Sequence, residues 1–308
     1  MSQLPPNSLL TPHQLRLKPY RYPHPAAEKI VNRHTACKAL MITIRHVVLF
    51  HNQKINKMAK LKGPLKIKGT IGEITFSRTE NGYIAKEKTS LDGTRIATDP
   101  AFQRTRENNA EFGRAGKATK LLRNAIRTLL QNAKDRKVTS RLTSEMMKVI
   151  KADATNPRGL RNVIDGEAEF LQGFDFNSNA RLGTTIFAPF NSVIDRVAGT
   201  LTVDMPSFIP AEQLAAPSGT THFKIVSMGA EIDFENETFI TDTKESAVLP
   251  WDATATTALN LVNAVTANST HPLFLVFGIQ FFQQVNGINY PLKNGTFNAL
   301  SLIKVSGV

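Results

Sequence analysis

The chain has few of the residues on which catalysis and metal binding usually depend. Its single cysteine, Cys37, excludes an intramolecular disulfide framework and any multi-cysteine metal site. Five of the seven histidines lie in residues 1–57, so only His222 and His271 remain in the rest of the chain. No His-Glu-x-x-His, Gly-x-Ser-x-Gly or Cys-x-x-Cys motif occurs. The sequence therefore predicts no catalytic residue, no cofactor and no metal site, and nothing in it selects an enzymatic function.

A long apolar run is also missing. The most apolar stretch, residues 39–50, is interrupted by Arg45 and His46. It is shorter than the roughly 20 residues that a membrane-spanning helix needs. It begins too late for a signal peptide and lacks a small-residue cleavage site. We therefore expect no membrane span, and a cytoplasmic or non-classically exported protein.

One glycine-rich segment, Gly113–Thr119, resembles a phosphate-binding loop only superficially. A P-loop has four residues between its glycines and a serine or threonine directly after its lysine. Here two residues separate the glycines Gly113 and Gly116, and Ala118 follows Lys117. The segment also lies within a helical pattern rather than after a strand, so we reject a nucleotide-binding function for it.

The two later histidines and one acidic cluster are interpreted as surface features. His222 and His271 lie at strand or loop positions, where we expect contact with solvent. In residues 231–237, acidic residues alternate with apolar ones, which is typical of the exposed face of a strand. A Ca²⁺ site would instead need oxygen ligands converging from loops. The acidic residues predicted to be exposed are Glu231, Asp233, Glu235 and Glu237.

Charge is distributed very unevenly along the chain. Residues 1–57 hold nine Lys/Arg and one acidic residue, residues 58–163 hold 23 and 10, and residues 164–308 hold six and 14. The three segments therefore carry net charges of +8, +13 and −8, within a total of +13. The N-terminal part of the chain is therefore basic and the C-terminal part is acidic. This asymmetry gives information about partners and association rather than about the fold.

Residues 1–57 differ in sequence pattern from the rest of the chain, because no helical or strand periodicity is sustained in them. The segment KINKMAK, residues 54–60, is typical of translated AT-rich DNA. We hypothesise that Met58 is the natural start and that residues 1–57 are translated upstream sequence. The alternative is a disordered basic arm. Mass spectrometry of the native N-terminus decides between them, since a peptide from within residues 1–57 would contradict the first hypothesis.

The strongest helical pattern spans Asp99–Ala133. Asp99 is a favourable N-cap, and Pro100 suits the first helical position. Placed at about 100° per residue, the segment has an apolar face opposite a densely basic one. Gly113 and Gly116 are expected to weaken or bend it. The candidate binding residues for an anionic partner, on this face and just beyond it, are Lys117, Lys120, Arg123, Arg127, Lys134, Arg136, Lys137 and Arg141.

A second helix is predicted from residue 139 or 140 to Ala152, and a short third one near residues 167–171. The second helix carries an apolar stripe at i, i+4, i+7 and i+8. Its members are Leu142, Met146, Val149 and Ile150. We expect this stripe and the residue 63–88 hairpin to cover the apolar face of the first helix.

Strand patterns flank the helices. Asn81-Gly82 predicts a type I′ hairpin within residues 63–88. From about Gly173 onward we count about eight strands, spaced as in an antiparallel sandwich. Residues 273–282 are nearly all apolar, which predicts a central strand covered on both faces.

The predicted fold is therefore α+β, in three parts. Residues 1–57 are a basic arm or an artefact. Residues 58–163 form a basic hairpin and helical region, and residues 164–308 form an acidic antiparallel β-sandwich.

Three segments that follow one another from Met58 onward carry a resemblance to known proteins. They are the Lys/Gly-rich start MAKLKGPLKIKGTIGEITFSR, a Gly-Tyr return strand, and TDPAFQRTRENNAEFGRA. In this order the chain resembles a group of uncharacterised Bacteroidetes proteins with a Lys/Gly-rich hairpin, a helical middle and a β-rich C-terminal half. No function is assigned to that group, so the resemblance implies architecture and brings no catalytic residues.

Two function classes follow from these patterns. The first is a non-enzymatic structural or assembly protein, because catalytic motifs are missing and the two parts of the chain carry opposite charge. Its partner would be itself or another protein, through basic-to-acidic docking. The second is nucleic-acid association, with phosphates on the basic helical face. Only Phe102 and Phe112 lie near that face in sequence, so base stacking is not supported. A solvated basic face remains a third interpretation.

Overall fold

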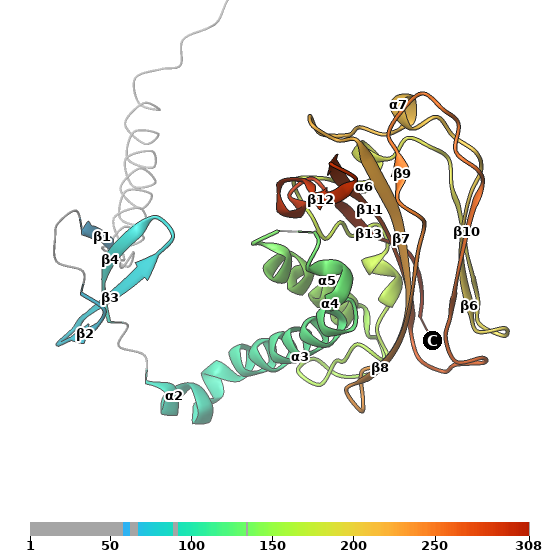
Figure 1. The fold of residues 1–308 in the computed structure, drawn as a ribbon. Helices are drawn as coiled ribbons and strands as arrows, with labels where there is room; N and C mark the ends of the chain where they lie inside the picture. The colour runs from blue at the N-terminus through green and yellow to red at the C-terminus, as the bar shows by residue number, and fades with distance from the viewer. Residues whose placement is uncertain (1–57, 62–66, 89–91, 134, 308) are drawn as a thin grey trace, which may run out of the picture. The chain divides into compact units, whose positions relative to one another are not determined.

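The chain divides into two compact units, residues 1–90 and residues 91–308 (Figure 1). The sequence-based boundary at residue 163 falls inside the second unit. Antiparallel sheets and helices together confirm the predicted α+β class. Residues 1–57 and Lys134 lie outside the described part of the chain. The residues that the computed structural model describes are 58–61, 67–88, 92–133 and 135–307.

In the first unit, the described strands form a four-stranded antiparallel sheet in the order β1-β4-β3-β2. The predicted hairpin is confirmed, but its loop is Glu80–Asn81, because Thr79 pairs with Gly82. The loop therefore begins one residue earlier than predicted. Gly82 opens the return strand at a φ of +111°, which L side chains rarely adopt. The strands are β1 (Met58–Leu61), β2 (Gly69–Ile71), β3 (Ile74–Thr79) and β4 (Gly82–Glu87).

The helices of the second unit follow the sequence pattern closely. Asp99 acts as an N-cap, since its Oδ1 accepts a hydrogen bond from Ala101 N at 2.9 Å, and Pro100 begins the first turn. The predicted third helix is a 3-10 turn. The helical bounds are α2 (Gly93–Thr98), η1 (Pro100–Phe102), α3 (Gln103–Ala125), α4 (Arg127–Leu130), α5 (Val138–Ala152), η2 (Ala168–Leu171), α6 (Leu182–Thr185), α7 (Pro210–Gln213) and η3 (Leu292–Gly295).

α3 is one continuous helix of 23 residues. Gly113 and Gly116, which were expected to weaken or bend the helix, do not interrupt it, and the first interruption lies further along. It falls at Ile126, where φ is −94° and ψ is 15°, and α4 follows directly. Ile126 is fully buried, so tertiary packing rather than low helix propensity sets the position of the break.

The strands of the second unit form two antiparallel sheets. In the larger sheet, β11 pairs with β7 on one side and with β12 and β13 on the other, while β7 also pairs with β8 and β9. The smaller sheet has the order β10-β6-β5. The bounds are β5 (Asn191–Asp195), β6 (Thr200–Met205), β7 (His222–Asp233), β8 (Thr238–Glu245), β9 (Leu249–Pro250), β10 (Leu259–Ala264), β11 (Leu273–Val285), β12 (Ile288–Pro291) and β13 (Ala299–Ser306).

The larger sheet lies between two apolar cores, with α3 and α5 on one side and β6 and β10 on the other (Figure 1). Even-numbered residues of its central strands, such as Ile232 and Phe274, belong to the core on the helical side. Odd-numbered ones, such as Ile225 and Phe277, belong to the core under the smaller sheet. The prediction that residues 273–282 form a strand covered on both faces is therefore confirmed.

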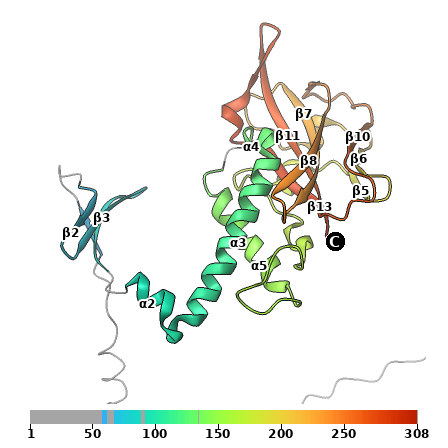
Figure 2. The same cartoon turned by 90° about the horizontal axis from the view of Figure 1, so that it is seen from below.

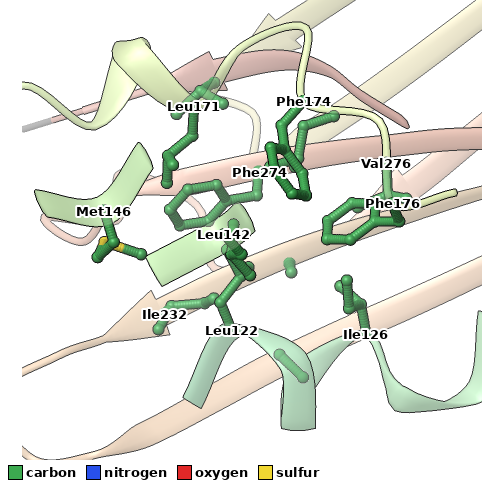
Figure 3. Close-up of a cluster of buried hydrophobic side chains, with 14 of the residues drawn as sticks. Leu122, Ile126, Leu142, Met146, Leu171, Phe174, Phe176, Ile232, Phe274 and Val276 are labelled. Carbon is green, nitrogen blue, oxygen red and sulfur yellow. The ribbon is translucent and has the colours of Figure 1, made fainter. Parts of the chain in front are cut away.

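The helical core joins elements that are far apart in sequence. Figure 3 shows Leu122 of α3, Leu142 and Met146 of α5, and Phe274 of β11 in one cluster. Each such side chain contributes roughly 1.5–3 kcal/mol by leaving water. All four residues of the predicted α5 stripe are fully buried, so that prediction is confirmed. Packing of the residue 63–88 hairpin against α3 stays a prediction.

The antiparallel character predicted for the C-terminal half is confirmed, but a two-sheet sandwich is not clearly formed. β10 lies beside β8, where Asn263 Nδ2 donates to the Asp242 carbonyl oxygen at 2.9 Å (Figure 2). The smaller sheet therefore curls round from one edge of the larger sheet. In addition, helices cover the larger sheet's other face.

Candidate functional site

The basic residues predicted from sequence occupy the outer surface of the helical layer. On the opposite side of α3, Ala118, Leu122 and Ala125 are buried, as predicted. Arg123 and Arg141 are half-buried, and Lys134 lies outside the described residues. The exposed members, called the basic stripe below, are Lys117, Lys120, Arg127, Arg136 and Lys137.

The basic stripe has no ionic partner in the part of the chain that the structure describes. No carboxylate there lies within 4.0 Å of any of its five side chains. Lys117 does share a hollow of about 190 Å³ with Glu237, from the turn between β7 and β8. One carboxylate of the β half therefore faces the end of the stripe without closing an ion pair.

Arg141 serves the fold. Its Nη2 donates to Asp135 Oδ2 at 2.7 Å and to the Asp175 carbonyl oxygen at 2.8 Å. Its guanidinium also lies 5.0 Å from the centre of the Phe174 ring. Burial raises the pKa of the Asp135 carboxyl, but hydrogen bonds from Lys137 N and Arg141 outweigh burial and lower the pKa to about 2. Arg141 thus joins α5 to the loop before the β half.

The N-terminal half of α3 clamps a loop that sequence reasoning missed. Buried Glu111 accepts a hydrogen bond from Gly159 N at 2.8 Å. Arg114 donates to the Gly159 carbonyl oxygen at 2.8 Å and to the Arg161 carbonyl oxygen at 2.9 Å. The only sequence signal for these contacts is the position of Glu111, which lies one turn before Ala115 on the apolar side of α3. These polar groups are therefore occupied and not free for a ligand.

Glu231 was predicted to be exposed, and this is wrong. It lies on the odd-numbered side of β7, which faces the smaller sheet, and it is buried. Its carboxylate accepts hydrogen bonds from Ser269 Oγ at 2.5 Å and from Thr266 N at 3.0 Å. Burial raises its pKa, but these hydrogen bonds outweigh burial and lower it. The alternation of acidic and apolar residues predicted the strand correctly. The solvent-exposed face inferred from it was the wrong one at Glu231.

The rest of the acidic cluster closes a turn. Asp233 is half-buried and accepts hydrogen bonds from the backbone N of Glu235 and of Asn236 at 2.9 and 3.0 Å. Glu235 and Glu237 are exposed, as predicted. Within residues 58–61, 67–88, 92–133 and 135–307, no group of three or more His, Cys, Asp or Glu is arranged to hold a metal ion.

Ser269 and His271 lie close together without forming a nucleophile and base. The hydroxyl of Ser269 donates to Glu231 and accepts from His271 backbone N at 3.1 Å. The His271 imidazole instead lies 3.8 Å from Asp233, Nε2 to Oδ2. The hydroxyl proton is thus held by a carboxylate whose role is structural, and the imidazole is not placed to remove it.

A groove runs along the outer face of α5. It consists of two hollows, of about 750 and about 380 Å³, which meet at Ser144. Arg136, Lys148 and Lys151 line the first hollow, and Arg141 and Arg181 line the second. The α5 groove is bounded by two exposed aromatic rings, Phe112 of α3 and Phe170 of η2.

The chain was compared with protein-family models, with curated proteins and with solved structures, and none of the three comparisons finds a match. No helix among the described residues has the length and apolarity that crossing a membrane requires.

Proposed function

We propose that the protein is a non-enzymatic structural or assembly protein that acts through protein–protein contacts. The observation that carries this proposal is unpaired charge of opposite sign on different parts of the second unit. The basic stripe has no ionic partner among the described residues, and several exposed carboxylates of the β half have none either. Each surface suits the other on a second copy.

The acidic surface is defined by residues on the strand side. Ala211 N donates to the Asp252 carbonyl oxygen at 3.0 Å, which brings the neighbouring Glu212 close to Asp252. Both acidic side chains are exposed. We call Glu212 and Asp252 the acidic surface.

Docking of the basic stripe of one copy on the acidic surface of the next is heterologous. Such contacts generate rings if the rotation closes, and open filaments if it does not. The contact is electrostatic, so salt weakens it as the screening length falls to about 8 Å at physiological ionic strength. The proposal therefore predicts self-association that is strong at low salt and reversible.

A mixing experiment tests this proposal. One variant carries Lys120→Glu and Arg127→Glu on the basic stripe, and the other carries Glu212→Lys and Asp252→Lys on the acidic surface. Light scattering at low salt should give large species for wild type and monomers for each variant alone. An equimolar mixture should give dimers, because each variant retains one intact surface. A wild-type protein that stays monomeric at low salt and high concentration contradicts the proposal.

A second candidate function is nucleic-acid association, with phosphates bound by the basic helical face. The observation that favours it is the pair of exposed rings beside cations in the α5 groove, which the sequence order does not reveal. A binding titration between about 50 and 200 mM salt should show a steep loss of affinity as counterion release becomes less favourable. No binding at the lower salt disposes of this candidate.

A further inference from the structure

We propose that the α5 groove binds single-stranded nucleic acid, with phosphates on Arg136, Lys151 and Arg181 and bases stacked on Phe112 and Phe170. This inference rests on the second candidate function above and deepens it, because it names the strandedness of the ligand and the residues that bind it. The groove differs from the basic stripe in four of these five residues.

The groove offers free cations. Arg136, Lys151 and Arg181 are exposed, and none has a carboxylate within 4.0 Å among the described residues. Lys148 differs, because its Nζ pairs with Glu145 Oε2 at 2.7 Å. Three guanidinium or ammonium groups without a carboxylate partner in the described part of the chain are thus available for phosphate oxygens.

Hydroxyl groups continue this polar lining between the cations. Thr139, Ser140, Thr143 and Ser144 face the larger hollow on successive turns of α5. Ser140 Oγ donates to the Lys137 carbonyl oxygen at 3.0 Å, and Thr143 Oγ1 donates to the Thr139 carbonyl oxygen at 2.8 Å. The hydroxyls of Thr139 and Ser144 are therefore the donors for phosphate and sugar oxygens, and such contacts do not read base sequence. The groove thus suits a backbone that runs along the helix, with little sequence preference.

The two rings are the feature that selects the ligand class. Phe112 is 61% exposed and Phe170 is 55% exposed. Neither belongs to an apolar core. Phe112 borders the hollow that contains Arg136 and Lys151, and Phe170 borders the hollow that contains Arg181 together with Glu145 and Asp175. A flat ring beside a cation fits an unpaired base next to its phosphate, because every base can stack by its π-face. An acidic peptide without apolar side chains would use the cations and leave the rings uncovered.

Duplex nucleic acid fits this site less well. In a duplex the bases are already stacked on one another, and only their edges face the grooves. Stacking on Phe112 and Phe170 therefore requires unpaired bases. Strandedness is for this reason the property by which the site is best tested.

Fluorescence anisotropy with a labelled dT oligonucleotide of about 20 nucleotides, on the full chain, tests the proposal. Replacing both rings, Phe112→Ala with Phe170→Ala, should weaken binding by roughly tenfold or more, since each stacked base contributes about fivefold or more to affinity. The matched control is Phe187→Ala, whose ring is 60% exposed but does not line the groove. That variant should bind like wild type.

Charge variants give an independent reading. Lys151→Gln and Arg181→Gln should each reduce the slope of log affinity against log salt by about one phosphate contact. Arg127→Gln, which removes an exposed arginine from the basic stripe outside the groove, should leave the slope unchanged. An rU oligonucleotide in place of dT shows whether RNA or DNA is preferred.

Several outcomes would overturn the inference. A duplex of equal length that competes as well as the single strand removes the stacking argument. Equal competition by polyglutamate would show that the groove binds acidic polymers in general and not nucleic acid in particular. Binding that is lost with Lys120→Gln and Arg127→Gln but not with the ring variants refutes the groove while leaving the second candidate function intact. No binding at about 50 mM salt refutes both.

Discussion

The Asp135 carboxylate and the Arg141 guanidinium meet at 2.7 Å, between Oδ2 and Nη2, where the chain turns into α5. Asp135 is almost fully buried, with 4% of its side chain exposed, and Lys137 N donates to its second oxygen at 2.7 Å. Asp135, just before α5, and Arg141, within α5, thus hold the start of the helix in place. This arrangement lowers the pKa of Asp135 from 3.8 to about 2.

The first prediction concerns acid stability. A carboxyl whose folded pKa is depressed stabilises the fold fully above its unfolded pKa and loses that effect as pH falls through the folded pKa. From this group, wild type should lose on the order of 2 kcal/mol between about pH 4 and pH 2. In Asp135→Asn this component should be missing, with stability reduced at pH 5.

Urea unfolding followed by circular dichroism at pH 5, 3 and 2 measures this difference. Glu212→Gln is the control, because Glu212 is an exposed carboxylate on the acidic surface. The same dependence of unfolding free energy on pH in wild type and Asp135→Asn would show that Asp135 carries none of it.

The second prediction concerns the loop clamped by α3. Gly159 has a φ of +90°, and a Cβ added there would lie 2.8 Å from Glu107 Cγ. Gly159→Ala should therefore destabilise the second unit by roughly 1–3 kcal/mol through backbone strain and crowding. Gly173→Ala is the control, because Gly173 has a φ of +81° but open space around it. Equal losses in thermal unfolding for both variants would mean that crowding against α3 contributes nothing.

The third prediction is a stabilising substitution on the same helix. Gly113 lies within α3, is exposed, and has nothing within 4 Å of an added Cβ. Gly113→Ala should raise the unfolding free energy by roughly 0.5–1 kcal/mol, because alanine loses less conformational freedom in a helix. Thermal melting measures it. An unchanged or lower melting temperature would indicate that α3 is frayed at Gly113 in solution.

The fourth prediction concerns the buried pair Glu231 and Ser269. Removing the hydroxyl in Ser269→Ala leaves a buried carboxylate with one donor fewer, which should cost roughly 1.5–3 kcal/mol at neutral pH. The pKa of Glu231 should then rise, so the loss should shrink as pH falls and the carboxyl protonates. A double-mutant cycle with Glu231→Gln isolates the coupling. Additive effects of the two substitutions would show that the hydrogen bond contributes no net stability.

Sequence patterns predicted most of the local structure correctly. The spacing of Leu142, Met146 and Val149 predicted α5, and the continuous apolar run at residues 273–282 predicted the central strand. Asp99 was correctly assigned as a cap. These features depend on periodicity and on hydrogen bonds between near neighbours, which the order of residues specifies directly.

The candidate site was only partly predictable. The exposed cations Lys117, Lys120 and Arg127 follow from the helical wheel. Arg141 was grouped with these cations, but it lies on α5, where Asp135 and Phe174 engage it within the fold. Glu231 was placed on the wrong face, because its partners Thr266 and Ser269 lie more than thirty positions along the chain.

By itself the sequence determined the α+β class, the positions of the main helices and strands, the lack of catalytic motifs, and the opposite charge of the two halves. Only the tertiary structure decided which charges stay unpaired and which rings stand beside them. Phe112 and Phe170 are far apart in sequence and border one groove only because η2 and α3 both pack near α5. The physical reason is that periodicity specifies a face, whereas packing between distant segments decides what that face meets.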